Sequence, residues 1–176
     1  MPEELSERYR VRPMVETDLE LVLAWRNNPA IRRYMYTQQE ISFVEHKHWF
    51  ELARQDQRRH LLIFESDSEP LGFISFCSKK DGSVADWGFY IAPNAPKGSG
   101  RKLGKTALDY AFGALHLHKV CGEVLTYNER SVHFHQSLGF SVEGRLREQH
   151  FDGGKYHDVM CFGLLASEWC KRPSDL

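Results

Sequence analysis

The chain has 176 residues, with 23 Lys and Arg against 24 Asp and Glu, so its formal net charge is −1. This length favours one domain over residues 1–176, and near-neutral charge without a dense basic patch argues against a nucleic-acid partner. No apolar run approaches the roughly 18 residues of a membrane-spanning helix, and the charged N-terminal segment lacks the apolar core of a signal peptide. We therefore expect a cytoplasmic protein with no membrane partner.

The N-terminal part predicts a strand followed by two capped helices. Residues 9–15 alternate and indicate the strand, and residues 17–20 (TDLE) have the spacing of a capping box with Thr17 as N-cap. That helix should end near Asn28, because the following proline disfavours helical geometry in the residue before it. Residues 42–45 (SFVE) form a second capping box and predict the second helix.

The rest of the chain predicts a strand meander and one strand–loop–helix–strand crossover. Apolar runs between turn signals indicate strands, and helical spacing follows a glycine-rich loop. The pattern is therefore α+β with a largely antiparallel sheet. The expected elements are strands at 60–65, 71–78 and 84–92, a helix from 99 to 115, a strand at 120–126, a short helix at 131–138, and strands at 146–151 and 156–165.

The glycine-rich loop, KGSGRK at 97–102, allows two anion-binding interpretations. A nucleotide P-loop ending in the Gly-Lys-Thr of 104–106 needs its first glycine at position 99, where this chain has serine. Alternatively, a helix begins near that serine, and its free N–H groups and dipole suit a pyrophosphate. A plain loop before a helix would look similar. The residues of the second interpretation are Lys97, Gly98, Ser99, Gly100, Arg101 and Lys102.

Motifs on both sides of this loop occur in a recognisable order. The preceding strand ends with Phe-Tyr-Ile-Ala-Pro at 89–93, and the later crossover carries Asn128, Ser131 and Leu-Gly-Phe at 138–140. This order resembles the acetyl-CoA core of the GNAT N-acetyltransferase superfamily, whose loop reads Arg/Gln-x-x-Gly-x-Gly/Ala. Lys97 and Lys102 depart from the first and last positions of that pattern.

The resemblance implies a GNAT fold, with a mostly antiparallel, twisted sheet that is splayed at its centre and has flanking helices. It implies acetyl-CoA as cosubstrate, an acceptor-binding part at about 8–60 and an acetyl-CoA core at about 61–165. Coenzyme contacts would come from the loop, from Asn128 and Ser131, and from the backbone of Tyr90 and Ile91. We expect no metal, because the paired histidines are two residues apart and do not share a helix face.

The resemblance also assigns candidate catalytic residues. Glu123, five residues before Asn128, would be the base, with Asp86 on the neighbouring strand as the competitor. The usual general acid of the family is a tyrosine four residues before Gly139, and this chain has His135 there. We expect His135 either to protonate the departing thiolate or only to bind near the sulfur. No cysteine has the context of a nucleophile, which predicts direct transfer without an acyl-enzyme.

The N-terminal part resembles one GNAT branch through Trp-Arg-Asn-x-Pro at 25–29, a Met after an aromatic, and Phe-x-x-His at 43–46. That branch acetylates the 4-amino group of a UDP-linked 4-amino-4,6-dideoxy sugar in pseudaminic acid biosynthesis, which serves flagellin glycosylation. The implied partner is a small amino-sugar nucleotide, and a homodimer is allowed. The alternatives are an N-terminal protein acetyltransferase of the ribosomal-protein type and a non-catalytic acyl-CoA-binding domain. The implied acceptor contacts are Arg26, Asn27, Met35, Tyr36, His46 and Trp49.

Overall fold

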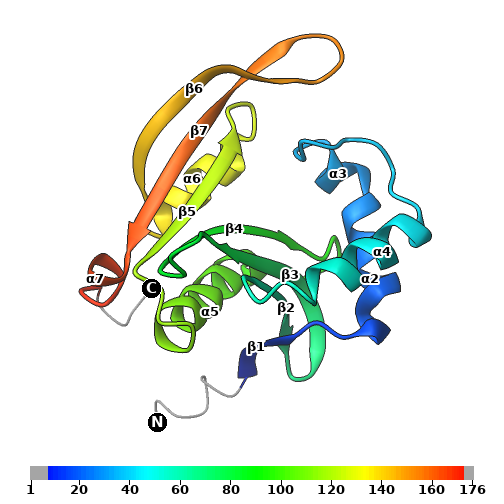
Figure 1. Cartoon of the computed structure of the whole chain (residues 1–176), viewed down its shortest axis with the longest axis horizontal. Helices are drawn as coiled ribbons and strands as arrows, with labels where there is room; N and C mark the ends of the chain where they lie inside the picture. Colours follow the sequence, from blue (N-terminus) through cyan, green and yellow to red (C-terminus); the bar gives the residue numbers. More distant parts are fainter. Residues whose placement is uncertain (1–7, 173–176) are drawn as a thin grey trace.

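The computed structural model describes residues 8–172 and contains one seven-stranded sheet in the order β1-β2-β3-β4-β5-β7-β6 (Figure 1). No helix of the described residues is long and apolar enough to cross a membrane. The strands are β1 (Tyr9–Pro13), β2 (Arg59–Ser66), β3 (Glu69–Ser78), β4 (Val84–Ile91), β5 (Lys119–Leu125), β6 (Ser141–Phe151) and β7 (Tyr156–Leu165). The helices are η1 (Glu16–Asp18), α2 (Leu19–Asn27), α3 (Pro29–Arg32), α4 (Phe43–Ala53), α5 (Ser99–Gly113), α6 (Glu129–Ser137) and α7 (Ala166–Trp169).

Strands β4 and β5 part at the centre of the sheet. They are the parallel neighbours, and their pairing runs from Val84–Lys119 only as far as Asp86–Cys121. Beyond that point β4 continues to Ile91 and β5 to Leu125, and Figure 1 shows the two strands running apart. The other neighbouring strands pair antiparallel. The expectation of a mostly antiparallel sheet that is splayed at its centre is confirmed.

Helices cover both faces of the sheet. Leu103, Ala107 and Leu108 of α5 are fully buried against one face, in a core that also takes in side chains of α6. Gly104 allows the close contact between α5 and α6, because a Cβ there would lie 2.8 Å from Leu138. A second apolar cluster buries the inner sides of α2 and α4 against the opposite face. Each large apolar side chain that leaves water in this way contributes about 1.5–3 kcal/mol.

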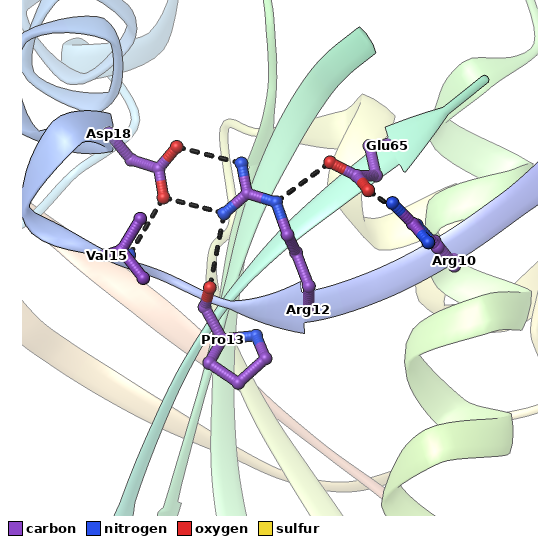
Figure 2. A network of polar contacts seen from close by, with 6 residues as sticks. All are labelled: Arg10, Arg12, Pro13, Val15, Asp18 and Glu65. Atoms are coloured by element: carbon purple, nitrogen blue, oxygen red, sulfur yellow. Dashed lines mark hydrogen bonds and ion pairs between the residues drawn. The ribbon is translucent and has the colours of Figure 1, made fainter. Parts of the chain in front are cut away.

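The start of α2 differs from the predicted capping box. Asp18, not Thr17, is the N-cap residue, and its carboxylate accepts the backbone N–H of Val15 at 2.8 Å. The same carboxylate takes two N–H groups of Arg12, at 2.8 and 2.9 Å (Figure 2). Hydrogen bonds between charged groups are stronger than those of a neutral hydroxyl cap. The ion pair with Arg12 of β1 therefore decides that α2 begins after Asp18.

The network continues to a buried carboxylate on β2. Glu65 is 2% exposed and accepts from Arg12 at 2.9 Å and from Arg10 at 2.6 Å (Figure 2). Burial alone would raise the pKa of Glu65, but the two arginine hydrogen bonds outweigh it and hold that pKa below its usual value. The ion network therefore attaches the edge strand β1 to both β2 and the start of α2.

The remaining helix boundaries follow local signals. Ser42 caps α4 as predicted, because its Oγ accepts from the amide of Glu45 at 3.3 Å while Glu45 accepts from the amide of Ser42 at 2.8 Å. Helix α2 ends at Asn27, as the proline predicted, but Pro29 then begins the short helix α3. Strand β6 begins at residue 141, five residues before its predicted start, and α6 begins at residue 129 rather than 131.

Candidate active site

The open edge of β4 carries the backbone groups that face the gap. In an antiparallel pair, opposite residues alternate between exchanging two hydrogen bonds and exchanging none. The amide of Ala92 donates to Leu71 of β3 at 2.8 Å, so the backbone of Tyr90 also faces β3. The backbone groups of Phe89 and Ile91 therefore point towards β5. The expected contact between the coenzyme and the backbone of Ile91 fits this geometry. The backbone of Tyr90, which was also expected to contact the coenzyme, faces β3, and that of Phe89 faces the gap instead.

The start of α5 offers free amides. Gly98 is the N-cap residue with φ of 91°, a left-handed conformation that favours glycine. The amide of Ser99 already donates to Pro96, and that of Lys102 to Gly98. Among residues 8–172, no acceptor is found for the amides of Gly98, Gly100 and Arg101. Three free N–H groups at a helix N-terminus have the geometry that favours an anion, and we call this group of amides the anion cradle.

The P-loop interpretation does not fit this helix. Lys105 lies inside α5, six residues after its start, and its ammonium pairs with Asp109 at 3.1 Å. A nucleotide-binding lysine stands at the mouth of the loop instead. The side chain of Lys102 also turns away from the cradle, since its Nζ lies over the ring of Tyr9, 5.5 Å from the centroid. Lys97 and Arg101 remain exposed beside the free amides.

His135 is part of the buried aromatic cluster behind the gap. The residue is only 2% exposed, and its Nε2 accepts the indole N–H of Trp87 at 3.1 Å. Its Nδ1 donates to the carbonyl of Ser131 at 2.8 Å. Burial lowers the pKa of His135 to about 4, despite the hydrogen bond to Ser131. The neutral imidazole donates its one N–H to Ser131, and its other nitrogen accepts from Trp87, so it has no free proton to give to a thiolate. This geometry argues against the general-acid hypothesis.

Gly122 makes the contact between Trp87 and His135 feasible. It lies on β5 next to the point of divergence, and a Cβ there would come 2.7 Å from His135 Nε2 and 2.8 Å from Trp87 Nε1. An isolated glycine inside a strand often marks such a close approach. That signal was present in the sequence and could have identified this position.

The two candidate bases have different surroundings. Asp86 is in the last residue pair before the strands part, and its carboxylate is 59% exposed with Lys79 at 3.7 Å. Glu123 is two residues beyond the divergence point of β5, on the face opposite α5 and α6. Its Oε2 accepts the hydroxyl of Tyr36 at 2.6 Å. The structure therefore brings Tyr36 and Glu123 together, 87 residues apart in the chain, and leaves Asp86 at the closed end.

Arg26 and Asn27 connect the end of α2 to the segment before α4. Asn27 Nδ2 donates to the carbonyl of Ile41 at 2.7 Å, and Asn27 Oδ1 accepts from the amide of Ile41 at 2.8 Å. These bonds within the fold use the side chain that was expected to contact an acceptor. One Arg26 nitrogen, Nη2, donates to the carbonyl of Thr37 at 2.8 Å. The other, Nη1, is buried without a partner among the described residues, and burial lowers the pKa of this guanidinium.

A cluster of rings adjoins Arg26 on the same face of the sheet. His46 is 4% exposed and stacks on Trp49 at 5.3 Å, and its Nε2 is also without a partner among residues 8–172. Trp49 meets Phe73 of β3, which packs against Tyr90 of β4 at 5.1 Å. Burial lowers the pKa of His46, and the charge of Arg26 lowers it further. The cluster therefore presents a cation and a neutral imidazole within apolar walls.

A family model for the acetyltransferase (GNAT) domain matches residues 8–141. The chain belongs to the GNAT acetyltransferase family. The spermidine N(1)-acetyltransferase of Escherichia coli (strain K12) is 30% identical over 153 residues, which cover 86% of this chain and 82% of the relative. The acetyltransferase PseH of Campylobacter jejuni is 30% identical over 126 residues, 71% of this chain and 78% of the relative.

Solved structures support the same assignment. The spermidine N-acetyltransferase of Vibrio cholerae, crystallised with CoA and spermine, has a TM-score of 0.86 at 28% identity and covers 93% of this chain and 99% of that chain. As a GNAT acetyltransferase, the protein is an acyltransferase, and the family uses acetyl-CoA as acyl donor. Among the described residues, no group of three or more His, Cys, Asp or Glu side chains could hold a metal ion.

Two predicted coenzyme contacts of this GNAT enzyme have structural partners of their own. Asn128 caps α6, because its Oδ1 accepts the amide of Ser131 at 3.2 Å. The carbonyl of Ser131 accepts from His135. The sequence interpretation missed Tyr127, whose hydroxyl donates to the carbonyl of Arg33 at 2.8 Å and accepts from Gln38 at 3.0 Å. Tyr127 thus attaches residues 33–38 to the end of β5.

Proposed function

We propose that this acetyltransferase transfers an acetyl group from acetyl-CoA to the 4-amino group of a UDP-linked 4-amino-4,6-dideoxy sugar, as in pseudaminic acid biosynthesis. The observation that carries the proposal is the charge of the segment facing β5. Residues 26–39 contain three arginines and no Asp or Glu, and this segment contacts Glu123 and Tyr127. A cationic wall of this kind suits the diphosphate of a sugar nucleotide.

The buried polar atoms on this side support the same acceptor. Within residues 8–172, Arg26 Nη1 is a buried donor without an acceptor, and buried unsatisfied groups cost about 1–3 kcal/mol each. An acceptor oxygen of the nucleotide sugar would remove that cost on binding. Met35 and Trp49 are partly exposed. They offer apolar surface for a base or for the methyl group of a 6-deoxy sugar.

A polyamine is the second candidate, because relatives named spermidine acetyltransferases match most of this chain. A polyamine carries several positive charges and is best bound by several carboxylates. Residues 26–39 provide none, and the arginines there would repel it. The charge pattern therefore favours the anionic acceptor over the cationic one.

The anion cradle fits the diphosphate of acetyl-CoA. The amides of Gly98, Gly100 and Arg101 would receive its oxygens, with Lys97 and the Arg101 side chain as cationic partners. The backbone of Phe89 and Ile91 would bond the pantetheine arm along the open edge of β4. Bound there, acetyl-CoA supplies the activated acetyl group.

Glu123 would remove the proton from the attacking amine, directly or through one water. It stands on the face of the sheet that carries residues 26–39, beside the opening of the gap. An acyl-enzyme is not needed, and burial raises the pKa of both Cys121 and Cys161, the thiols nearest in the sheet. These thiols stay protonated at neutral pH and are poor nucleophiles.

A thiol-release assay with product analysis tests the proposal. The acceptors are a UDP-4-amino-4,6-dideoxy sugar panel, spermidine, and a peptide with a free N-terminus. We expect kcat/KM for a UDP-amino sugar to exceed that for spermidine by at least about 100-fold. Arg26→Gln should raise the KM for the sugar nucleotide and leave the KM for acetyl-CoA unchanged.

Other outcomes would contradict the proposal in distinct ways. Faster turnover of spermidine would establish the polyamine as acceptor, and faster turnover of the peptide would establish N-terminal acetylation. Acetyl-CoA binding by calorimetry without thiol release for any acceptor would indicate a non-catalytic acyl-CoA-binding domain.

A further inference from the structure

We propose that Tyr36 is a further catalytic residue, whose hydroxyl gives the departing thiolate its proton while Glu123 restores the proton to Tyr36. The inference rests on the proposed role of Glu123 as base. It concerns acid catalysis, which was one of the two roles that the family resemblance implied for His135.

The contact between Tyr36 and Glu123 lies at the mouth of the gap. Tyr36 Oη is 2.6 Å from Glu123 Oε2, a short charge-assisted hydrogen bond. On β5, Cys121 is the last residue paired with β4, and Glu123 follows two residues later on the same face of the strand. The phenol is therefore held beside the site where the two strands open, on the acceptor side.

The position of Tyr36 is set by the fold and not by a flexible loop alone. The next residue, Thr37, accepts a hydrogen bond from Arg26 through its carbonyl at 2.8 Å. Gln38 bonds Tyr127 at 3.0 Å, and the ring of Tyr36 rests 5.2 Å from that of His150 on β6. Contacts to α2, β6 and the end of β5 thus orient the hydroxyl towards Glu123.

His135 cannot supply the proton in this arrangement. It lies on the opposite face of the sheet, with Nε2 accepting from Trp87 and Nδ1 donating to Ser131. By contrast, the Tyr36 residue is 50% exposed and its hydroxyl bears a proton that it donates to a carboxylate. Partial burial and the hydrogen bond to Glu123 raise the pKa of Tyr36, so the phenol remains protonated at neutral pH.

The proton balance of the step closes on these two side chains. As the amine nitrogen bonds the acetyl carbon, Glu123 takes one proton from that nitrogen. As the carbon–sulfur bond breaks, the Tyr36 proton passes to sulfur and the proton on Glu123 passes to the Tyr36 oxygen. The products are an amide and a free thiol, and Tyr36 and Glu123 return to their starting states. General acid catalysis of this type contributes about 10²–10⁴-fold.

Tyr36→Phe tests the proposal, because it keeps the ring and removes only the hydroxyl. We expect kcat to fall about 100-fold, with the KM values for acetyl-CoA and for the acceptor within about threefold of wild type. Tyr156→Phe, at a 61% exposed tyrosine near the β6–β7 turn, is the matched control and should retain wild-type kcat. A kcat for Tyr36→Phe within about twofold of wild type would overturn the proposal.

A titration provides a readout that does not depend on turnover. Ultraviolet difference titration of wild type against Tyr36→Phe gives the pKa of this phenol, and Glu123→Gln should shift it down towards the ordinary tyrosine value. An unchanged Tyr36 titration in Glu123→Gln would show that the two groups are not coupled and would contradict the relay. If the amino-sugar panel fails but another amine is acetylated, the proposed function fails, while Tyr36→Phe with that amine still decides the relay.

Discussion

Trp87 of β4 donates its indole N–H to Nε2 of His135 on α6, at 3.1 Å, beside the point where β4 and β5 part. The backbone of Gly122 on β5 lies close to both rings, so two strands and a helix meet at this place. His135 occupies the position at which the family pattern has its tyrosine acid. In this protein that residue bonds Trp87 and Ser131 instead, and under our proposal the thiolate receives its proton from Tyr36 on the opposite face of the sheet.

The first prediction concerns how the free energy of unfolding depends on pH. Burial lowers the pKa of folded His135 to about 4, below the ordinary 6.5, so between these values the unfolded chain binds a proton that the folded chain does not. The free energy of unfolding should therefore fall as pH drops from about 6.5 to about 4, with His135 accounting for about 3 kcal/mol. Urea unfolding of His135→Gln across this range should show a flatter dependence. His133→Gln, an exposed position of α6, should keep the wild-type slope.

A second prediction tests the close approach at the divergence point. Gly122→Ala places a methyl group 2.7 Å from His135 Nε2 and 2.8 Å from Trp87 Nε1, so one of the rings must move. We expect a loss of about 1–3 kcal/mol in the free energy of unfolding, measured by denaturant titration. Gly113→Ala at the end of α5 meets no atom within 4 Å and should be neutral or stabilising by up to about 1 kcal/mol. Equal effects of the two substitutions would refute the steric explanation.

The third prediction separates the anion cradle from the rest of α5. Lys97→Met removes an exposed cation beside the free amides, and we expect the Kd for CoA to rise about tenfold in calorimetry. The increase should shrink at high salt, because the contact is electrostatic. Lys105→Met on the same helix removes a lysine that already pairs with Asp109, and it should leave the Kd unchanged. A similar loss in both variants would argue against a site at the start of α5.

The fourth prediction addresses the network in Figure 2. Glu65→Gln removes the buried charged acceptor that Arg10 and Arg12 share, although Arg12 keeps Asp18, and we expect a loss of about 2 kcal/mol in the free energy of unfolding. Asp67→Asn is the control, since Asp67 pairs with Arg8 on the exposed surface at 3.3 Å. That substitution should change stability by less than about 0.5 kcal/mol. A thermal-unfolding comparison in which both variants behave alike would contradict the role of Glu65.

Local signals in the sequence predicted many boundaries correctly. The capping box at Ser42, the end of α2 before Pro29 and the start of α5 at Ser99 depend on neighbouring residues within one turn. The box predicted at Thr17 was wrong for a nonlocal reason. Arg12, from the preceding strand, bonds the carboxylate of Asp18, and Asp18 is the N-cap residue of α2. The predicted box had placed Asp18 one residue inside the helix.

By itself, the sequence determined the seven strands, the four longer helices and the glycine-rich start of α5, because turn chemistry and the alternation of apolar residues act over a few neighbours. The motifs around that loop indicated the family through their resemblance to GNAT enzymes. Only the tertiary structure decided that Phe89 rather than Tyr90 faces the gap, that Asn27 is occupied by Ile41, and that Tyr36 meets Glu123. These relationships depend on strand register and on contacts between residues far apart in the chain, and a one-residue change of register reverses which groups face an opening.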